Sequence, residues 1–386
     1  MAAWTQSLTL AHIGLTGWRT RVGTSIVIIV GMSCVVGVLA SALAVHAGMM
    51  RMATGTGDPS QAIVVGAKSP PEFGGVIARS DVTIILNAPG IARGPSGSAL
   101  ADAEVRYRTY PPDGIYWQGI SITGIGAAGI DLRPNFRVVA GRMFKPGLHE
   151  LLIGRSAQQV YGLKIGDAVP VASGQWLIVG VFSSGGDLLE SQLVTDAVTL
   201  MTSTRMLGYG NVLVRLQSPQ VFDPFKRWLT TNPALQVSAE RQAQYYIRSA
   251  GFWLNYFNFF AYFAGAVMSI GALFGSINLL YGVVSARGLE IATFRALGYR
   301  ALPVAASVVA EAALLAIIGA IIGLSVAWVV FDGRQMVNGF GIFSLFLSAQ
   351  VVALCLGWVI VLALVGALPP ALRAARLPVS EALRAS

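Results

Sequence analysis

The residues that most often perform chemistry in proteins form no catalytic or metal-binding pattern in this 386-residue sequence. Its three histidines, His12, His46 and His149, are far apart in the chain, and none belongs to a Cys/His spacing typical of a zinc site. No serine lies in a GxSxG motif, which presents the nucleophile in many hydrolases. We therefore predict neither an enzyme active site nor a metal bound by this chain.

Nucleotide-binding motifs are also missing from the sequence. No segment matches GxxxxGK[ST], the loop whose backbone amides hold phosphates in many ATPases. Gly124, Gly126 and Gly129 fit the spacing GxGxxG, but residues 130–134 follow them in place of a helix whose N-terminus could face a pyrophosphate. We interpret these glycines as a turn and predict that this chain binds no cofactor, so that ATP and magnesium belong to another polypeptide.

Long uncharged stretches are the most informative feature of the sequence. Charged side chains are absent from residues 24–45, 252–284 and 335–372, and only Glu311 interrupts residues 301–331. At ~1.5 Å per residue in a helix, each stretch is long enough to cross a ~30 Å hydrocarbon core. We therefore predict four transmembrane helices, at residues 24–48, 252–284, 301–331 and 346–372.

Arginines cluster on one side of these predicted spans. Arg19 and Arg21 precede the first span, residues 285–300 carry three arginines between the second and third, and three more follow the fourth. The short outer loop at 332–345 carries one. By the positive-inside rule, both termini and residues 285–300 are cytoplasmic, and residues 49–251 lie outside. We expect a multi-pass protein of the bacterial inner (cytoplasmic) membrane with a large periplasmic domain.

The formal net charge of +9 fits this topology. The positive charge is shared between the cytoplasmic flanks and the outer domain, as expected near membrane lipids, and we predict no nucleic-acid partner. Cys34 and Cys355 both lie in predicted spans, so the outer domain has no disulfide. Residues 1–23 are expected to form a cytoplasmic interfacial helix before an uncleaved anchor, and residues 373–386 a cytoplasmic tail.

The outer region, residues 49–251, is typical of a mixed α/β domain. Most of its short apolar runs predict strands, whereas residues 156–161 and 224–230 predict helices and residues 82–86 fit either. The chain has no helix breaker between Arg241 and the second span, so we expect stalk helices that extend the first two spans outward. The expected fold is an α-helical membrane protein with four transmembrane helices and a large mixed α/β extracytoplasmic domain inserted between the first and second.

Aromatic residues concentrate at the outer end of the second span. Trp253, Tyr256, Phe257 and Phe260 could contact a hydrophobic substrate or a lipid tail. The alternative, which we favour, is an ordinary interfacial aromatic belt that continues into lipid-facing packing.

Glycine pairs one helical turn apart occur in two spans. Gly271 and Gly275 lie in the second span, and Gly319 and Gly323 lie in the third. Such spacing permits close approach of neighbouring helices in lipid. Glu311 precedes the second pair, and its charge costs much less near a span end or beside a cation than at the bilayer centre. We interpret all five as helix-packing residues.

The segment between the second and third spans has the strongest specific pattern. It reads Arg287-Gly-Leu-Glu290-Ile291-Ala-Thr-Phe294-Arg295-Ala-Leu297-Gly298. Glu290 and Phe294 are one turn apart, Arg287 and Glu290 can pair, and Gly298 supplies a C-terminal stop, so an amphipathic helix is predicted. A solvated connector is the alternative.

This pattern, R-x-x-E-I-x-x-x-R-A-L-G, resembles the cytoplasmic coupling helix of the MacB/FtsX-like permeases, the type VII ABC transporters. Glu311 followed by Gly319 and Gly323 is similar to the third span of that family, residues 369–384 to its C-terminal tail, and residues 141–181 to its MacB-like periplasmic core domain. The resemblance implies that the ATPase-facing positions are Arg287, Glu290, Ile291, Phe294, Arg295, Leu297 and Gly298.

The resemblance also implies partners and a function. We expect a homodimeric permease that binds two copies of a separate ABC ATPase, since only about 23 residues precede the first span. The expected activity is export of an amphiphilic or hydrophobic compound or peptide by mechanotransmission, the transfer of ATPase motion to the periplasmic domain. A periplasmic adaptor (membrane fusion protein) and an outer-membrane channel would complete a tripartite efflux assembly. The alternatives are lipoprotein or lipid extraction and FtsX-like regulation of a cell-wall hydrolase.

Overall fold

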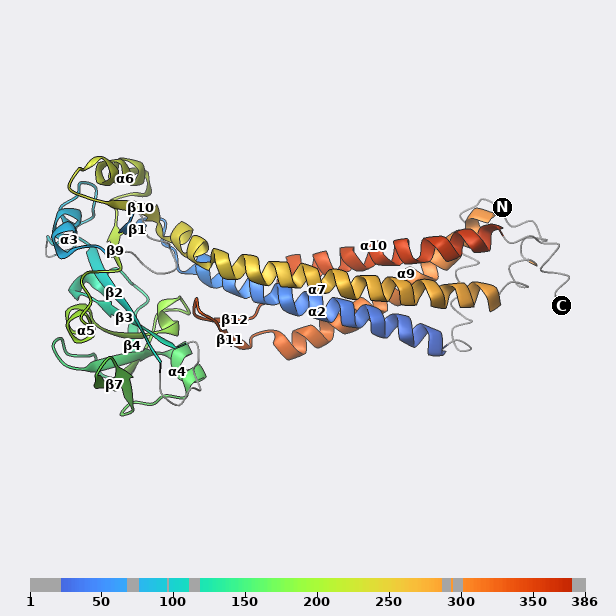
Figure 1. Cartoon of the computed structure of the whole chain (residues 1–386), viewed down its shortest axis with the longest axis horizontal. Coiled ribbons are helices and arrows are strands. Elements are labelled where there is room, and N and C mark those ends of the chain that lie inside the picture. The colour runs from blue at the N-terminus through green and yellow to red at the C-terminus, as the bar shows by residue number, and fades with distance from the viewer. Residues whose placement is uncertain are drawn as a thin grey trace. The chain divides into compact units, whose positions relative to one another are not determined.

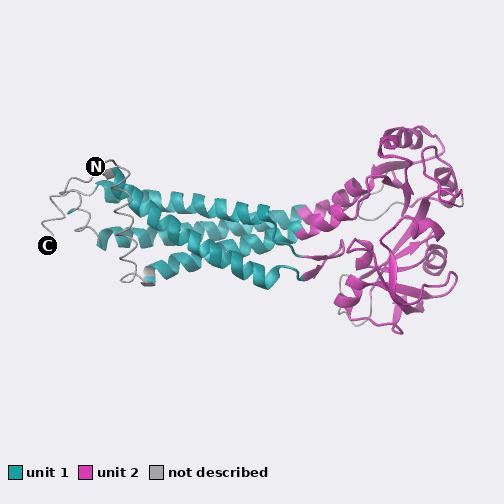
Figure 2. Cartoon of the chain, turned by 180° about the vertical axis from the view of Figure 1, so that it is seen from behind, with its two compact units in different colours: residues 1–47, 255–334, 345–386 teal, residues 48–254, 335–344 magenta. Residues whose placement is uncertain are grey.

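The structure is a computed structural model of the chain, and it describes residues 22–67, 76–95, 97–110, 119–286, 293 and 301–376. Figure 2 shows two compact units. The helical unit comprises Met1–Ala47, Asn255–Arg334 and Leu345–Ser386, and the sheet unit comprises Gly48–Leu254 and Gln335–Ser344.

The described residues contain four helices that are long and apolar enough to cross a membrane. Figure 1 shows them as the four long ribbons, which are α2 (Val22–Gly55), α7 (Gln242–Ala286), α9 (Ala301–Phe331) and α10 (Ala349–Arg376). Each helix overlaps the residue range predicted for one span. Helix α7 begins ten residues before the uncharged stretch, and α10 begins three residues later than expected and continues to Arg376.

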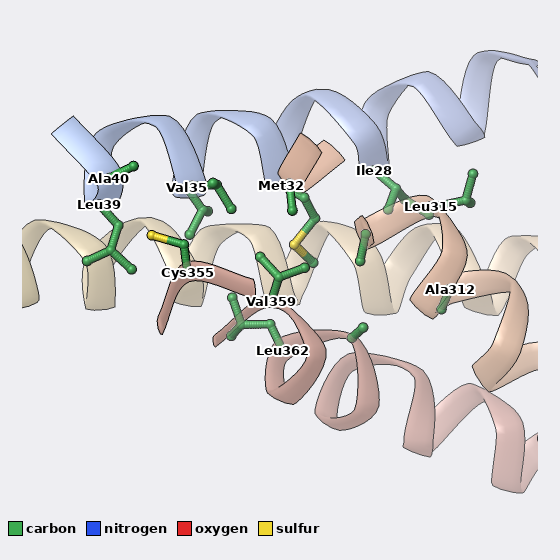
Figure 3. Packing of buried hydrophobic residues seen from close by; sticks show 14 of the residues in the cluster. Ile28, Met32, Val35, Leu39, Ala40, Ala312, Leu315, Cys355, Val359 and Leu362 are labelled. Carbon is green, nitrogen blue, oxygen red and sulfur yellow. The ribbon is translucent and has the colours of Figure 1, made fainter. Parts of the chain in front are cut away.

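Buried apolar side chains hold the helices of the helical unit together. Figure 3 shows side chains of α2, such as Met32 and Val35, gathered with those of α9 and α10. Val35 and Val359 are almost completely buried, and Cys355 is part of the same cluster. In lipid, close packing of this kind replaces the hydrophobic effect as the source of helix association.

The described part of the sheet unit contains a ten-stranded mixed sheet. Its strand order is β10-β1-β9-β2-β3-β8-β5-β7-β4, with β6 paired to β7. Most neighbours are antiparallel, but β3 and β8 are parallel, as are β5 and β7. The strands are β1 (Gln61–Gly66), β2 (Ala101–Thr109), β3 (Ile120–Ile125), β4 (Arg137–Gly141), β5 (Glu150–Gly154), β6 (Ala168–Val171), β7 (Gly174–Ser183), β8 (Leu193–Asp196), β9 (Asn211–Arg215) and β10 (Val237–Arg241).

Short helices cover this sheet and close its apolar cores. In α6 (Phe222–Thr231), Phe222, Phe225 and Leu229 are buried at spacings of three and four residues, so one face of the helix packs on the sheet. The other helical segments of the sheet unit are α3 (Arg79–Leu86), α4 (Arg155–Tyr161) and α5 (Ala197–Thr204), with the 3₁₀ turns η2 (Ala127–Gly129), η3 (Leu189–Ser191) and η4 (Pro219–Val221).

The architecture confirms the predicted fold class: four apolar helices, with a mixed α/β domain between the first and second. The ambiguous residues 82–86 are helical in α3, which buries Val82 and Ile85. The predicted interfacial helix at 1–23, except for residues 22 and 23, and the last ten residues of the predicted tail lie outside the described residues.

The predicted outer loop at 332–345 contains a two-stranded hairpin. It consists of β11 (Gln335–Val337) and β12 (Ile342–Ser344). The turn is closed by Asn338, whose Oδ1 accepts hydrogen bonds from the backbone N–H groups of Phe340, at 2.9 Å, and Gly341, at 3.1 Å. This hairpin belongs to the sheet unit, although it lies within the uncharged stretch that also includes the fourth span.

Candidate packing and binding sites

Gly319 and Gly323 lie where α9 packs closely on α2. A Cβ on Gly319 would lie 2.7 Å from the Ile29 carbonyl oxygen and 2.8 Å from Met32 Cβ, and a Cβ on Gly323 would lie 2.5 Å from the Ser33 carbonyl oxygen. Ser33 Oγ donates a hydrogen bond of 2.9 Å to the Gly319 carbonyl oxygen. The absence of side chains at these two positions therefore lets the two backbones approach closely enough for the Ser33 hydroxyl to reach the Gly319 carbonyl oxygen.

The other glycine pair has a different environment. Among the described residues, a Cβ built on Gly271 or Gly275 would meet no heavy atom within 4 Å apart from the neighbouring backbone of its own helix. Both glycines line an apolar hollow of about 250 Å³ between α7 and α2, together with Gly31 and Cys34. Within the described part of this chain no helix packs closely on Gly271 and Gly275, so their packing role stays a prediction from the sequence.

Two further polar residues link helices of the helical unit. Trp358 Nε1 on α10 donates a hydrogen bond of 2.9 Å to Ser269 Oγ on α7, and that hydroxyl donates one of 2.6 Å to the Gly265 carbonyl oxygen. No sequence pattern predicts this link, because single Ser and Trp residues are ordinary in spans. Glu311 is half-buried on α9.

The aromatic residues predicted as one cluster are divided between the two units. Tyr256 and Phe260 of the helical unit are exposed, with ring centroids 4.6 Å apart, and Phe257 is half-buried. Trp253 belongs to the sheet unit, where it lines a cavity. Exposed rings on a membrane helix suit the interfacial aromatic belt that we favour, and a substrate contact at Tyr256 and Phe260 stays the alternative prediction.

The predicted ATPase-facing residues lie outside the described residues. These are Arg287, Glu290, Ile291, Phe294, Arg295, Leu297 and Gly298. Thr293, within the same segment, is described and is helical. The ATPase-facing role of those seven residues therefore stays a prediction from the sequence pattern.

Charged side chains of the sheet unit are buried on one face of β2. Alternate residues of a strand share a face, which places Asp102, Glu104, Arg106 and Arg108 together, while Val105 points into the apolar core on the other side. Asp102 and Glu104 expose only 3 % and 2 % of their surfaces. Sequence reasoning missed this cluster because an alternating strand normally presents its polar face to water.

Glu104 is the best-paired member of this cluster. It accepts a hydrogen bond from Arg133, forming an ion pair, and one of 2.9 Å from Asn211 Nδ2. Arg106 Nη2 lies 4.0 Å from the same carboxylate. Burial by itself raises the pKa of Glu104, but the two guanidinium groups, Arg133 first, hold it below its ordinary value. Glu104 is therefore a buried anion with matched cations.

Asp102 is less completely paired. Its Oδ1 accepts a hydrogen bond of 2.9 Å from the Gly126 backbone N–H, whereas its Oδ2 is buried without a partner among the described residues. Burial, and next the neighbouring Glu104 carboxylate, raise the pKa of Asp102 to about 7. A Cβ on Gly126 or Gly129 would lie within 2.5 Å of its carboxylate oxygens. These glycines of the GxGxxG spacing thus form a turn that packs around a carboxyl group.

Replacing Asp102 with Asn should remove a pH dependence of stability. The native carboxyl keeps its proton up to pH about 7, whereas the unfolded one, at its ordinary value of 3.8, releases it. The native state therefore binds more protons, and the free energy of unfolding falls as pH rises from about 4 to about 7. At ~1.4 kcal/mol per pKa unit, the total loss is up to about 4 kcal/mol.

The measurement is the midpoint of thermal unfolding of the purified chain at pH about 5 and about 8. Asp102→Asn should show a smaller decrease between these pH values than the unchanged chain. Asp223→Asn, at an exposed position of α6, is the matched control and should retain the full decrease. Equal decreases in both variants would show that Asp102 carries no proton in the native state at pH 5.

Comparison with known families identifies the membrane part of the chain. Residues 262–379 match the family model described as FtsX-like permease C-terminal. The chain carries an FtsX-like permease domain. This match confirms the resemblance to FtsX-like permeases, and the FtsX-like domain includes both glycine pairs, Glu311 and the segment with the R-x-x-E-I-x-x-x-R-A-L-G pattern.

Two other comparisons complete this result. No curated protein sequence matches the chain. Among solved structures, the chain is similar to the crystal structure of the extracellular domain of the noncanonic ABC-type transporter YknZ from Gram-positive bacteria. That similarity has a TM-score of 0.35 and 17% sequence identity, and covers 47% of this chain and 99% of the other.

Proposed function

We propose that this FtsX-like permease is the non-catalytic membrane subunit of an ABC transporter whose ATP is hydrolysed by a separate polypeptide. The observation that carries the proposal is the arginine-rich pattern at 287–298 inside the matched FtsX-like domain. The lack of a GxxxxGK[ST] motif in the sequence supports a separate ATPase. Two ATPase copies would bind a homodimer of this chain through Arg287, Glu290, Ile291, Phe294, Arg295, Leu297 and Gly298.

The proposed orientation follows from the positive-inside rule. Both termini and the 287–298 segment are placed in the cytoplasm, and the sheet unit is placed in the periplasm of a bacterium, with the four helices crossing the inner membrane. Helix α7 is one helix of 45 residues that includes residues of both units. We propose that such continuous helices transmit ATPase-driven displacement, because an α-helix resists bending and stretching.

Export of an amphiphilic or hydrophobic compound or peptide is the transport activity that we favour. A folded extracytoplasmic domain with cavities that open to solvent supports handling of a substrate outside the membrane. In this proposal a periplasmic adaptor and an outer-membrane channel complete the export path. Lipoprotein or lipid extraction is the second candidate, because the exposed rings of Tyr256 and Phe260 also suit an acyl chain.

Co-purification with reconstitution tests the proposed function. The chain is isolated from its own cells in mild detergent, and bound proteins are identified by mass spectrometry. We expect a polypeptide with a GxxxxGK[ST] motif, and ATP hydrolysis in proteoliposomes that depends on this chain and moves a fluorescent amphiphile. Recovery of no such polypeptide would contradict the proposal, and activation of a cell-wall hydrolase without solute movement would replace transport with regulation.

A further inference from the structure

The sheet unit contains a cavity that the permease assignment does not explain. Its volume is about 370 Å³, within the ~300–1,000 Å³ typical of small-molecule sites. It is bounded by β2 and β3, by residues of α7 up to Trp253, and by the hairpin turn at 339–340. All of these segments belong to the sheet unit.

Two arginines give the cavity its charge. Arg106 and Arg108 line it from successive positions on one face of β2, and among the described lining residues none is acidic. The carboxylate of Glu104 lies 4.0 Å from Arg106 but bonds Arg133 and Asn211, and it does not line the cavity. The described lining therefore carries a net positive charge.

Arg106 is held in place and still accessible. Its Nη1 donates a hydrogen bond of 3.2 Å to Tyr245 Oη, and 34 % of its side-chain surface is exposed. A guanidinium has five N–H donors, more than these contacts occupy. Arg108 is fixed by bonds from Nη2 to Ser121 Oγ, at 3.1 Å, and to the Gly339 carbonyl oxygen, at 2.8 Å. Both cations are thus preorganised at the cavity wall.

Helix α7 supplies a partly apolar wall. Tyr246, Ser249 and Trp253 follow one another at spacings of three and four residues, so they share a helix face, and all three line the cavity. The Trp253 ring packs so closely on Gly339 that a Cβ there would lie 2.8 Å from it. Phe340 adds a second ring beside this contact. The cavity therefore combines cations with aromatic surface.

Ser249 contributes a buried hydroxyl to the same wall. Ser249 Oγ is inaccessible to solvent and has no hydrogen-bond partner among the described residues. Leaving such a group unpaired costs free energy, and an atom in the cavity would reach this hydroxyl only after a local rearrangement of α7.

We propose that this cavity binds an amphiphilic anion. Arg106 and Arg108 hold its carboxylate, phosphate or sulfonate group, and Trp253 and Phe340 contact its apolar part. The further statement that this anion is the exported substrate rests on the proposed function. The binding site itself does not require transport.

The test compares two probes that share a ring system and differ in charge. Binding of naphthalene-2-sulfonate and of uncharged 2-naphthylmethanol to the full chain is measured by calorimetry in nanodiscs of zwitterionic lipid, with empty nanodiscs as the blank. We expect the sulfonate to bind at least about tenfold more tightly, as one charge-assisted hydrogen bond allows. Arg108→Gln should remove this preference, and Trp253→Leu should weaken both probes.

Further variants control for the change in net charge and for a failure to fold. Arg227→Gln, the same charge change at an exposed position of α6, should bind both probes as the unchanged chain does. Arg106→Gln should act like Arg108→Gln; if it fails to fold, Arg108→Gln and Trp253→Leu decide. Equal affinities for the two probes, or an equal loss in Arg227→Gln and Arg108→Gln, would overturn the proposal.

A competition arm distinguishes the source of the anion. Displacement of the sulfonate by dihexanoyl-phosphatidylglycerol supports a phospholipid occupant, and retention of the sulfonate supports a non-lipid anion. Because no ATPase is present, failure of the proposed coupling to an ATPase leaves this measurement unchanged.

Discussion

If this chain stimulates a separate ATPase as proposed, replacing Glu290 with arginine is expected to abolish that stimulation of ATP hydrolysis. Glu290 is the single acid between Arg287 and Arg295 in the predicted coupling helix. In the predicted helix, charge reversal would remove the expected pairing with Arg287 and place like charges on one helix face. If the ATPase surface is complementary to the negative charge of Glu290, the new arginine would also repel that surface. We expect at least about a tenfold loss of chain-dependent ATP hydrolysis, since a like-charge contact costs several kcal/mol.

The control for this variant is a charge reversal elsewhere. Asp223→Arg changes the net charge equally at an exposed position of α6 in the sheet unit, and it should leave ATP hydrolysis unchanged. Both variants should insert in the membrane and unfold at the same temperature as the unchanged chain. Full stimulation of the ATPase by Glu290→Arg would show that this segment is not the coupling helix.

A single methyl group at Gly323 is expected to disrupt the packing of α9 on α2. In Gly323→Ala, the new Cβ would lie 2.5 Å from the Ser33 carbonyl oxygen and 3.1 Å from both Ser33 Cα and Val36 Cβ. Two of these atoms are backbone, so no side-chain rotation relieves the overlap and the helices must separate. Overpacking typically costs 1–3 kcal/mol, roughly, and separation also weakens the Ser33 hydrogen bond to Gly319.

Gly271→Ala is the matched control for this effect. It makes the same substitution in another span, where the new Cβ would meet no heavy atom of the described residues within 4 Å apart from the neighbouring backbone of its own helix. The midpoint of thermal unfolding of the purified chain in detergent should fall for Gly323→Ala and stay unchanged or rise for Gly271→Ala. Equal midpoints in the two variants would mean that the α2–α9 contact does not stabilise the helical unit.

The sequence predicts the membrane helices well because length and charge decide them locally. A stretch such as 301–331 has no stable alternative to a helix in lipid, since each backbone polar group must be paired within the segment. Strand β10 was not predicted, because Val237–Arg241 is short and contains Ser, Glu and Arg. Its conformation is fixed by antiparallel pairing with β1, a partner more than 170 residues away, as the pairing of Gly66 with Val237 shows.

The environments of the candidate sites likewise depend on contacts between residues distant in the chain. The two glycine pairs have identical spacing, yet the distance to the facing helix gives them different environments, and sequence spacing does not report that distance. The alternation of β2 predicts a polar face for Glu104 and Arg106 but not that α7 and residues 126–133 cover it. Burial of that face depends on segments distant in the chain, so the charge cluster and the cavity beside it emerged only from the structure.

The most direct test of the central claim is the side of the membrane on which the 287–298 segment lies. In a chain with Cys34 and Cys355 replaced by alanine, single cysteines are introduced as Thr293→Cys and, in the sheet unit, as Leu207→Cys, where 90 % of the leucine is exposed. Spheroplasts are then treated with a membrane-impermeant maleimide. We predict that Leu207→Cys is labelled at once and Thr293→Cys only after the membrane is permeabilised. Labelling of Thr293→Cys in intact spheroplasts would contradict coupling to a cytoplasmic ATPase.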